Sequence, residues 1–229
     1  MTQNRKKLTR RTFLKGSAAA AGVFSIAPRH VLGGPGQTPP SEKLNIAGVG
    51  VGGRGGSNIR ALMQRGANLV ATCDVDSKHT VSSLERFLPK EFRSNLKAQT
   101  FEDYRVMFDK VKTIDAVVIS TPDHMHAPIA LMAMRLGKHV YVEKPMAHSI
   151  EEARIMARVA KEQGIVSQMG NGGHAGEGLR LIKEWLDDRA IGTVREVHCW
   201  SDRPGNYWTQ NLDRPADKPP VPEGLNWDL

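Results

Sequence analysis

The sequence predicts an α/β protein built on a doubly wound parallel sheet of the Rossmann kind, followed by the start of an incomplete second α/β domain. Three observations predict the sheet. Strand-like apolar runs alternate with helix-length segments from Leu44 onward, a glycine-crowded turn separates the first strand from the first helix, and an acidic residue follows the second strand. Strands separated by helix-length segments imply right-handed βαβ crossovers, and therefore a parallel sheet.

The expected elements follow one another in this alternating order along the chain. Ser149 and Glu152 form a capping-box pattern at the start of the helix over 150–163, and Gly164 ends that helix. Strands are expected at 44–49, 68–73, 97–100, 115–120, 139–142, 165–169 and 193–200, and helices at 56–65, 77–88, 102–110, 126–136, 150–163 and 177–187.

The glycine-rich turn has the spacing of a dinucleotide-binding site. Gly48, Gly50 and Gly53 satisfy G-x-G-x-x-G between a strand and a helix, where glycine permits positive φ and lets backbone amides approach a pyrophosphate. Asp74 ends the second strand, where a carboxylate accepts hydrogen bonds from the adenosine ribose and repels a 2′-phosphate. Asp74 thus favours NAD, whereas Arg54, beside the turn, is suited to a 2′-phosphate and leaves NADP open. The alternative is a glycine turn that only links strand to helix.

The N-terminus has the composition of an export signal. Residues 9–15 read T-R-R-T-F-L-K, and an alanine-rich apolar stretch follows over 16–27. Paired arginines before a mild apolar run are typical of a twin-arginine signal, and this run is too short and too weakly apolar to predict a membrane span. We therefore expect residues 1–42 to be a signal peptide and lead-in, and the protein to be periplasmic or otherwise exported. An ordinary amphipathic helix and an uncleaved signal anchor are the alternatives.

Charge and cysteine content exclude several classes of protein. Residues 1–40 hold seven of the 32 Lys and Arg and no acidic residue, so the remainder carries 25 basic against 24 acidic residues. A nearly neutral body gives no sign of nucleic-acid binding despite the net charge of +8. The two cysteines, Cys73 and Cys199, predict neither a disulfide framework nor a cysteine-based metal site.

Two loops that follow predicted strands contain the candidate catalytic residues. In the loop over 142–145, the Lys144 ammonium is placed to hydrogen-bond a sugar hydroxyl and stabilise a developing alkoxide as hydride leaves; a surface lysine is the alternative. In the loop over 120–126, His124 and His126 share a face of an extended chain, but no third ligand is spaced for zinc, so we expect no metal. We favour His126 as a helix-start or cofactor-side residue, and His174 is a weaker candidate for the substrate side.

The segment from 201 to 229 concentrates prolines and tryptophans without a regular period. Such a segment is typical of an irregular surface loop, because Pro and Trp in loops commonly pack locally. The alternative is an aromatic rim near a substrate-binding mouth.

The motifs GVGVGG, CDVD, STPDHMHAPIA and YVEKPMA, in this order, resemble the glucose–fructose oxidoreductase / inositol dehydrogenase (Gfo/Idh/MocA) family. The resemblance implies a Rossmann domain over 43–165 and a C-terminal substrate domain beginning at 166–229. It also implies roles for individual residues: Gly48, Gly50 and Gly53 at the pyrophosphate, Asp74 at the adenosine ribose, Thr121, Pro122 and His126 along the cofactor, Glu143 near the nicotinamide ribose, and Lys144 as the catalytic lysine.

The resemblance also implies an activity and its limits. The family acts on sugars or polyols by hydride transfer to NAD(P), while some relatives, the NAD-dependent α-N-acetylgalactosaminidases, oxidise transiently during glycoside cleavage. The family's D-x-x-x-H motif has no match here, so we expect these 229 residues to be truncated and to lack a complete active site. Twin-arginine export of folded protein predicts a tightly bound cofactor, and the sequence leaves open whether the full-length protein is a homo-oligomer. A nucleotide-binding scaffold without turnover is the non-enzymatic alternative.

Overall fold

The structure is a computed structural model that describes residues 38–39, 42–93, 96–201, 213 and 216–229. Internal contacts divide the chain into two units, residues 1–43 and residues 44–229. The predicted signal peptide lies outside the described residues. Everything below concerns the second unit.

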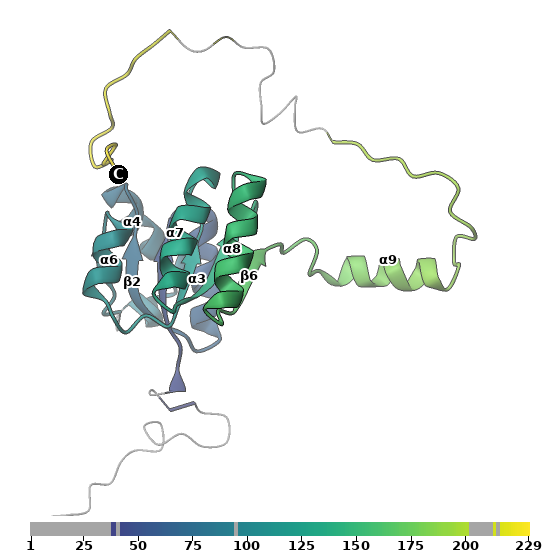
Figure 1. The fold of residues 1–229 in the computed structure, drawn as a ribbon, viewed down its shortest axis with the longest axis horizontal. Helices are drawn as coiled ribbons and strands as arrows, with labels where there is room; N and C mark the ends of the chain where they lie inside the picture. The colour runs from purple at the N-terminus through teal and green to yellow at the C-terminus, as the bar shows by residue number, and fades with distance from the viewer. Residues whose placement is uncertain (1–37, 40–41, 94–95, 202–212, 214–215) are drawn as a thin grey trace, which may run out of the picture. The chain divides into compact units, whose positions relative to one another are not determined.

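Six parallel strands form one sheet in the order β3-β2-β1-β4-β5-β6 (Figure 1). The strand order reverses beside β1, which pairs with β2 on one side and β4 on the other, and such a switch point is where doubly wound sheets bind ligands. The predicted Rossmann fold is therefore confirmed. The strands are β1 (Asn45–Val49), β2 (Asn68–Cys73), β3 (Gln99–Phe101), β4 (Ala116–Ile119), β5 (His139–Glu143) and β6 (Ser167–Gly170).

Helices connect the strands and cover both faces of the sheet, and the central strands β1 and β2 contribute side chains to a buried cluster on each face. The larger cluster joins the sheet to Met107 and Phe108, to Ile129 and Met134, and to Met156. The smaller cluster lies on the opposite face, against the first helix and the end of the second. The helices are α3 (Gly53–Gln64), α4 (Ser77–Phe87), α5 (Lys90–Arg93), α6 (Tyr104–Lys110), α7 (Asp123–Arg135), α8 (Ile150–Glu162) and α9 (Glu177–Asp187).

Backbone hydrogen bonds join the carboxyl ends of the central strands. The Gly50 N–H donates to the Cys73 carbonyl at 2.9 Å, and the Ser120 N–H donates to the Val49 carbonyl at the same distance. The ends of β2, β1 and β4 therefore meet at one edge, and the loops that follow them surround a common space.

The predicted capping box is present in full. The Ser149 hydroxyl accepts from the Glu152 N–H at 3.2 Å, and the Glu152 carboxylate accepts from the Ser149 N–H at 2.9 Å. Gly164, with φ +63°, follows the end of α8 as predicted.

The structure corrects three predicted elements. The strand expected over 193–200 is absent, because this exposed segment has no neighbouring strand among the described residues. Helix α7 begins at Asp123 rather than at 126, and the four-residue helix α5 was not predicted. Strand β6 lies after the predicted domain boundary at 165 yet belongs to the same sheet, and the division into domains stays a prediction.

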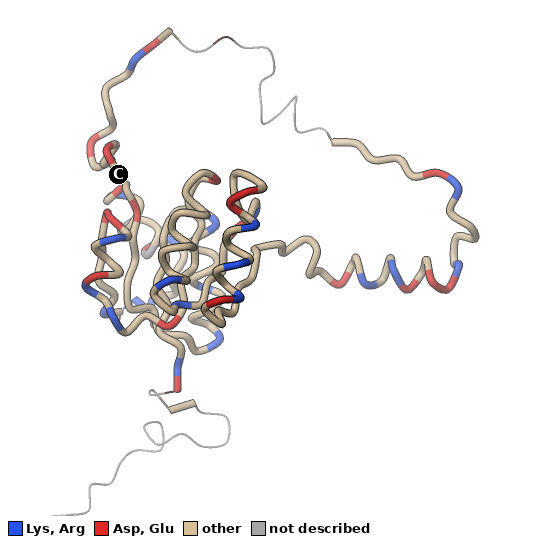
Figure 2. Tube along the Cα trace, in the orientation of Figure 1, with Lys and Arg blue, Asp and Glu red and all other residues tan. Residues whose placement is uncertain are grey.

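Basic and acidic residues alternate over the helices of the sheet domain, as expected from its nearly neutral composition (Figure 2). Among the helices within the described residues, none combines the length and the apolar composition needed to cross a bilayer.

Candidate dinucleotide site

The three glycines of the motif differ in their surroundings, so an added Cβ would have a different effect at each. A Cβ on Gly50, where φ is +75°, would lie 2.7 Å from the backbone of Ser120 and Thr121, so this glycine lets the turn close against the loop after β4. A Cβ on Gly48 would overlap Ile59 of α3. Gly53 has φ +38° and open space around its Cβ position. The first two glycines therefore serve packing within the chain, while the third leaves the start of α3 uncovered.

The start of α3 is suited to an anion. The helix begins at Gly53 after the N-cap residue Gly52, which provides no side-chain cap, and its first turn contains no acidic residue. The first amides of a helix have no intrahelical acceptor, and the helix dipole favours negative charge there. A phosphate at this position would be bound by backbone N–H groups alone.

Asp74 is held at the end of β2 by the turn itself. One carboxylate oxygen accepts from the Val51 N–H at 2.9 Å, and the other accepts from the Asp76 N–H at 3.1 Å. The carboxylate thus lies beside the glycine turn, as its predicted contact with a ribose requires. Burial, together with the Asp74 charge, raises the pKa of the neighbouring Cys73 thiol to about 12, so this cysteine is an inert core residue.

His126 connects the loops that follow β4 and β5. Its side chain is buried, with Nδ1 2.6 Å from the Pro145 carbonyl oxygen and Nε2 2.9 Å from the Thr121 carbonyl oxygen. A neutral imidazole has a single N–H and donates to one of these oxygens, whereas the protonated ring donates to both. His126 therefore positions the Thr121 loop against the Lys144–Pro145 peptide, which is cis.

The histidine pair does not share a face, contrary to expectation. His124 and His126 both lie in the first turn of α7, where residues two apart point in different directions; His124 is exposed and His126 buried. Within the described part of the chain, no three His, Cys, Asp or Glu side chains are grouped to hold a metal ion.

Glu143, at the end of β5, is a buried carboxylate with partners from α3. Asn58 Nδ2 donates to its Oε1 at 2.9 Å, and Arg54 Nε lies 3.5 Å from the same oxygen. A Cβ on Gly170 of β6 would lie 2.7 Å from the Glu143 carboxyl group, so glycine at this position makes room for the carboxylate. Lys144, the next residue, is exposed. The Arg54 side chain is thus directed to the end of β5 and not to Asp74.

A cavity of about 650 Å³ lies at the switch point of the sheet. It is lined by the glycine turn, the end of β2, the loops after β3 and β4, and residues of the 222–229 segment. The hydroxyl oxygens of Ser120 and Thr121 are buried in its lining without a hydrogen-bond partner among the described residues. Unsatisfied buried hydroxyls beside an uncapped helix N-terminus fit a polar ligand with phosphate groups.

The structure brings together part of the predicted site. Gly50, Asp74, Thr121 and Pro122 line the cavity, whereas Arg54, His126, Glu143 and Lys144 lie outside its lining, around the ends of β4 and β5. His174 lies exposed in the turn after β6. Sequence reasoning missed His79, whose ring Nδ1 is 3.8 Å from the Gly52 Cβ position, and the lining residues Leu225, Asn226, Trp227 and Leu229.

These features define a Rossmann domain with a candidate dinucleotide site at its switch point. Residues 44–171 match the family described as "Oxidoreductase family, NAD-binding Rossmann fold", the Gfo/Idh/MocA family, and the chain belongs to it. Residues 7–27 match the twin-arginine translocation signal, so the predicted export through this pathway is confirmed.

Relatives with different activities are similar to this chain. A glycosyl hydrolase family 109 protein of Shewanella pealeana is 31% identical over 165 residues, which are 64% of this chain and 35% of that protein. An inositol 2-dehydrogenase of Rubrobacter xylanophilus is 36% identical over 128 residues, 54% of this chain and 33% of that enzyme. The chain thus spans about a third of the length of these relatives.

A solved structure supports the same cofactor class. The crystal structure of GenD2 from gentamicin A biosynthesis, in complex with NAD, has a TM-score of 0.58 and 29% identity to this chain. The alignment covers 67% of this chain and 42% of GenD2.

Proposed function

We propose that this chain is the cofactor-binding part of an exported, NAD-dependent oxidoreductase that acts on a sugar or a polyol. The observation that carries the proposal is the cavity at the switch point, where an uncapped helix start, the Asp74 carboxylate and two unpaired hydroxyls converge. NAD supplies an electrophilic nicotinamide carbon that takes up a hydride when it is bound.

In this proposal, the residues of the chain divide into binding and reaction groups. The first backbone amides of α3 bind the pyrophosphate, and Asp74 accepts hydrogen bonds from the ribose hydroxyls. The Ser120 and Thr121 hydroxyls supply further hydrogen bonds along the cofactor. His126 acts indirectly, because its two ring nitrogens hold the loop after β4 next to the loop after β5.

Lys144 is the proposed reaction group. As the carbinol carbon gives up hydride, the hydroxyl loses its proton and the C–O bond becomes a carbonyl. The charged ammonium of Lys144 donates a hydrogen bond to that oxygen and stabilises the developing negative charge. In this role Lys144 is a hydrogen-bond donor, and the hydroxyl proton passes to another base. The histidine that the family resemblance predicts in a C-terminal domain is suited to be that base.

The charges around the cavity favour NAD over NADP. Asp74, Asp76, Glu102 and Asp103 all line it. The side-chain hydrogen bond from Arg105, together with its charge, lowers the pKa of Asp103, so this carboxylate stays ionised at neutral pH. Arg54, the basic residue that sequence reasoning offered for a 2′-phosphate, lies next to Glu143 instead. Four acidic side chains at this end would repel a 2′-phosphate.

A second candidate function is glycoside cleavage through transient oxidation with retained NAD. The similarity to a glycosyl hydrolase family 109 protein favours it, and it uses the same cofactor site. The two candidates differ in their products, because net oxidation releases a carbonyl compound and reduced cofactor, whereas transient oxidation releases a free reducing sugar.

The proposal is tested on the full-length protein recovered after export. Acid would release the bound nucleotide, which is identified by chromatography and mass spectrometry, and polyols and glycosides would then be screened for reduction of NAD and for release of sugar. We expect stoichiometric NAD(H), and no turnover by Lys144→Ala although it retains the nucleotide. A protein that neither carries nor binds NAD or NADP would contradict the proposal, whereas a protein that retains the nucleotide but turns over no substrate would favour a nucleotide-binding scaffold.

A further inference from the structure

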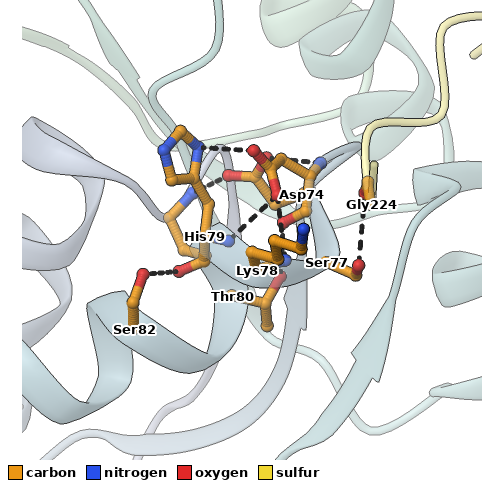
Figure 3. Close-up of polar contacts among 9 residues, drawn as sticks. Asp74, Ser77, Lys78, His79, Thr80, Ser82 and Gly224 are labelled. Atoms are coloured by element: carbon orange, nitrogen blue, oxygen red, sulfur yellow. Dashed lines mark hydrogen bonds and ion pairs between the residues drawn. The ribbon is translucent and has the colours of Figure 1, made fainter. Parts of the chain in front are cut away.

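The segment from Pro222 to Leu229 is bound to the start of α4 by backbone atoms. The Gly224 carbonyl accepts from the Ser77 N–H at 3.0 Å and from the Ser77 hydroxyl at 3.2 Å (Figure 3). The Asn226 N–H donates to the Val75 carbonyl at 2.8 Å, and Leu225 forms an antiparallel bridge with Asp76. The segment therefore pairs with the chain that directly follows Asp74, much as a short added strand would.

Side chains fix the same placement. Asn226 Nδ2 donates to Glu102 Oε2 at 3.1 Å, which ties the segment to the loop after β3, and Lys78 pairs with Glu223 at 3.0 Å. Gly224 has φ +92°, and a Cβ there would lie 3.2 Å from both Ser77 and Lys78. The contact therefore depends on the positive φ of Gly224 and on the close fit of Gly224 against Ser77 and Lys78.

This segment forms one wall of the dinucleotide cavity. Leu225 and Trp227 line it together with Asp74, and the Trp227 side chain remains 74% exposed, so its apolar surface is free to contact a ligand. If Asp74 binds the adenosine ribose, the adenine attached to that ribose occupies the part of the cavity beyond Asp74. Within the cavity lining, Leu225 and Asn226 adjoin this part, because they pair with Asp76 and Val75, which directly follow Asp74.

We propose that residues 222–229 form the adenine subsite of the dinucleotide site, with Leu225 and Trp227 packing on the base. The assignment rests on the proposed function and extends it, because it gives the adenine a binding surface from a part of the chain outside the matched family region, 44–171. An aromatic side chain suits adenine, whose flat face stacks on aromatic rings and needs no specific hydrogen bond.

The test compares ligands that contain adenine with one that lacks it. Calorimetric titrations of the 229-residue chain with NAD, AMP and nicotinamide mononucleotide are made for the wild type and for Trp227→Ala. Stacking of a base on an aromatic ring is worth enough to change affinity by about fivefold or more. We expect Trp227→Ala to weaken NAD and AMP by a similar factor of that size, and nicotinamide mononucleotide to bind unchanged.

A second test variant, Gly224→Ala, and two control variants distinguish a lost contact with the nucleotide from a general loss of folding. Gly224→Ala and Gly137→Ala both add a methyl group at positive φ, +92° and +73°, but only the first meets neighbouring side chains. Trp185→Ala removes another exposed tryptophan, on α9. Gly224→Ala should weaken AMP binding, whereas Gly137→Ala and Trp185→Ala should not, with thermal unfolding checking that each variant is folded.

The outcomes distinguish this inference from the proposed function. AMP and NAD affinities of Trp227→Ala within twofold of wild type would overturn the adenine subsite and leave the proposed function intact. Tighter binding by the variant would also overturn it, because the segment would then compete with the nucleotide. A wild-type chain that binds no adenine nucleotide would overturn both.

Discussion

Glu143 takes its position from residues in two other parts of the chain, α3 and β6. Asn58 and Arg54 approach its Oε1 from α3, and β6 provides a residue without a side chain, Gly170, next to the carboxyl group. A buried carboxylate is costly unless donors satisfy it, and Asn58 and Arg54 provide such donors for Glu143 beside Lys144. The reaction end of the site thus depends on neighbours that themselves need not touch a substrate.

Gly170→Ala tests this close packing. The added methyl group would lie 2.7 Å from the Glu143 carboxyl carbon, so the carboxylate must move away from Asn58. Overpacking of a buried site costs about 1–3 kcal/mol, and we expect the free energy of unfolding in urea to fall by that amount. Gly172→Ala is the control, because its added methyl group would meet no atom within 4 Å. Equal stability of the two variants would contradict the account.

The elements that the sequence predicted correctly are those whose physical causes lie within a few neighbouring residues. The glycine turn and the Ser149 capping box are short patterns whose physical causes lie within a few residues, and both are found where the sequence places them. The strand expected over 193–200 was wrong, since alternation of apolar residues indicates a strand only where a partner strand is available. Helix α5 is too short to show a helical period.

The candidate site was predictable only in part. Asp74 and Thr121 follow strands directly, so their convergence follows from parallel topology. The contact of Gly224 with Ser77 spans 147 residues of sequence and uses a backbone carbonyl, and no residue pattern in a single sequence reports such a contact. The pairing of Arg54 with Glu143 likewise depends on three-dimensional packing.

Ser149→Ala tests the capping box of α8. The substitution removes the acceptor for the Glu152 N–H and leaves a first-turn amide without its partner. Loss of such an N-cap costs about 0.5–2 kcal/mol, so we expect the midpoint of urea unfolding to fall accordingly. Ser82→Ala, an exposed serine within α4, is the control and should be neutral or slightly stabilising, because alanine is the better helix former. A Ser149→Ala midpoint equal to that of Ser82→Ala would contradict the prediction.

At the scale of the whole molecule, the cavity at the switch point is assembled from the ends of four adjoining strands, the helices that follow them and one distant segment. Its walls carry acidic side chains, while the start of α3 carries none. This separation places the positive end of a helix dipole at one part of the cavity and negative charge at another. The arrangement matches a ligand with a pyrophosphate in its middle and an uncharged adenosine at one end.

Nucleotide binding should therefore stabilise the whole domain selectively. A ligand present at 100 times its Kd adds about 2.7 kcal/mol to the free energy of unfolding, which for a domain of this size raises the Tm by roughly 5–11 °C. We expect NAD to produce such a shift and NADP at the same concentration to produce a much smaller one, because of the carboxylates around Asp74. A larger shift with NADP would contradict the assignment of NAD.

The distance in sequence between Ser77 and Gly224 also has a consequence in time. A ribosome adds about 5–20 residues per second, so the 147 residues between them take roughly 7–30 s to synthesise after α4 has begun to emerge. During this interval the end of β2 and the start of α4 lack their contacts with residues 222–229. If residues 222–229 form the adenine subsite as proposed, nucleotide binding at full affinity therefore waits until this segment has been synthesised.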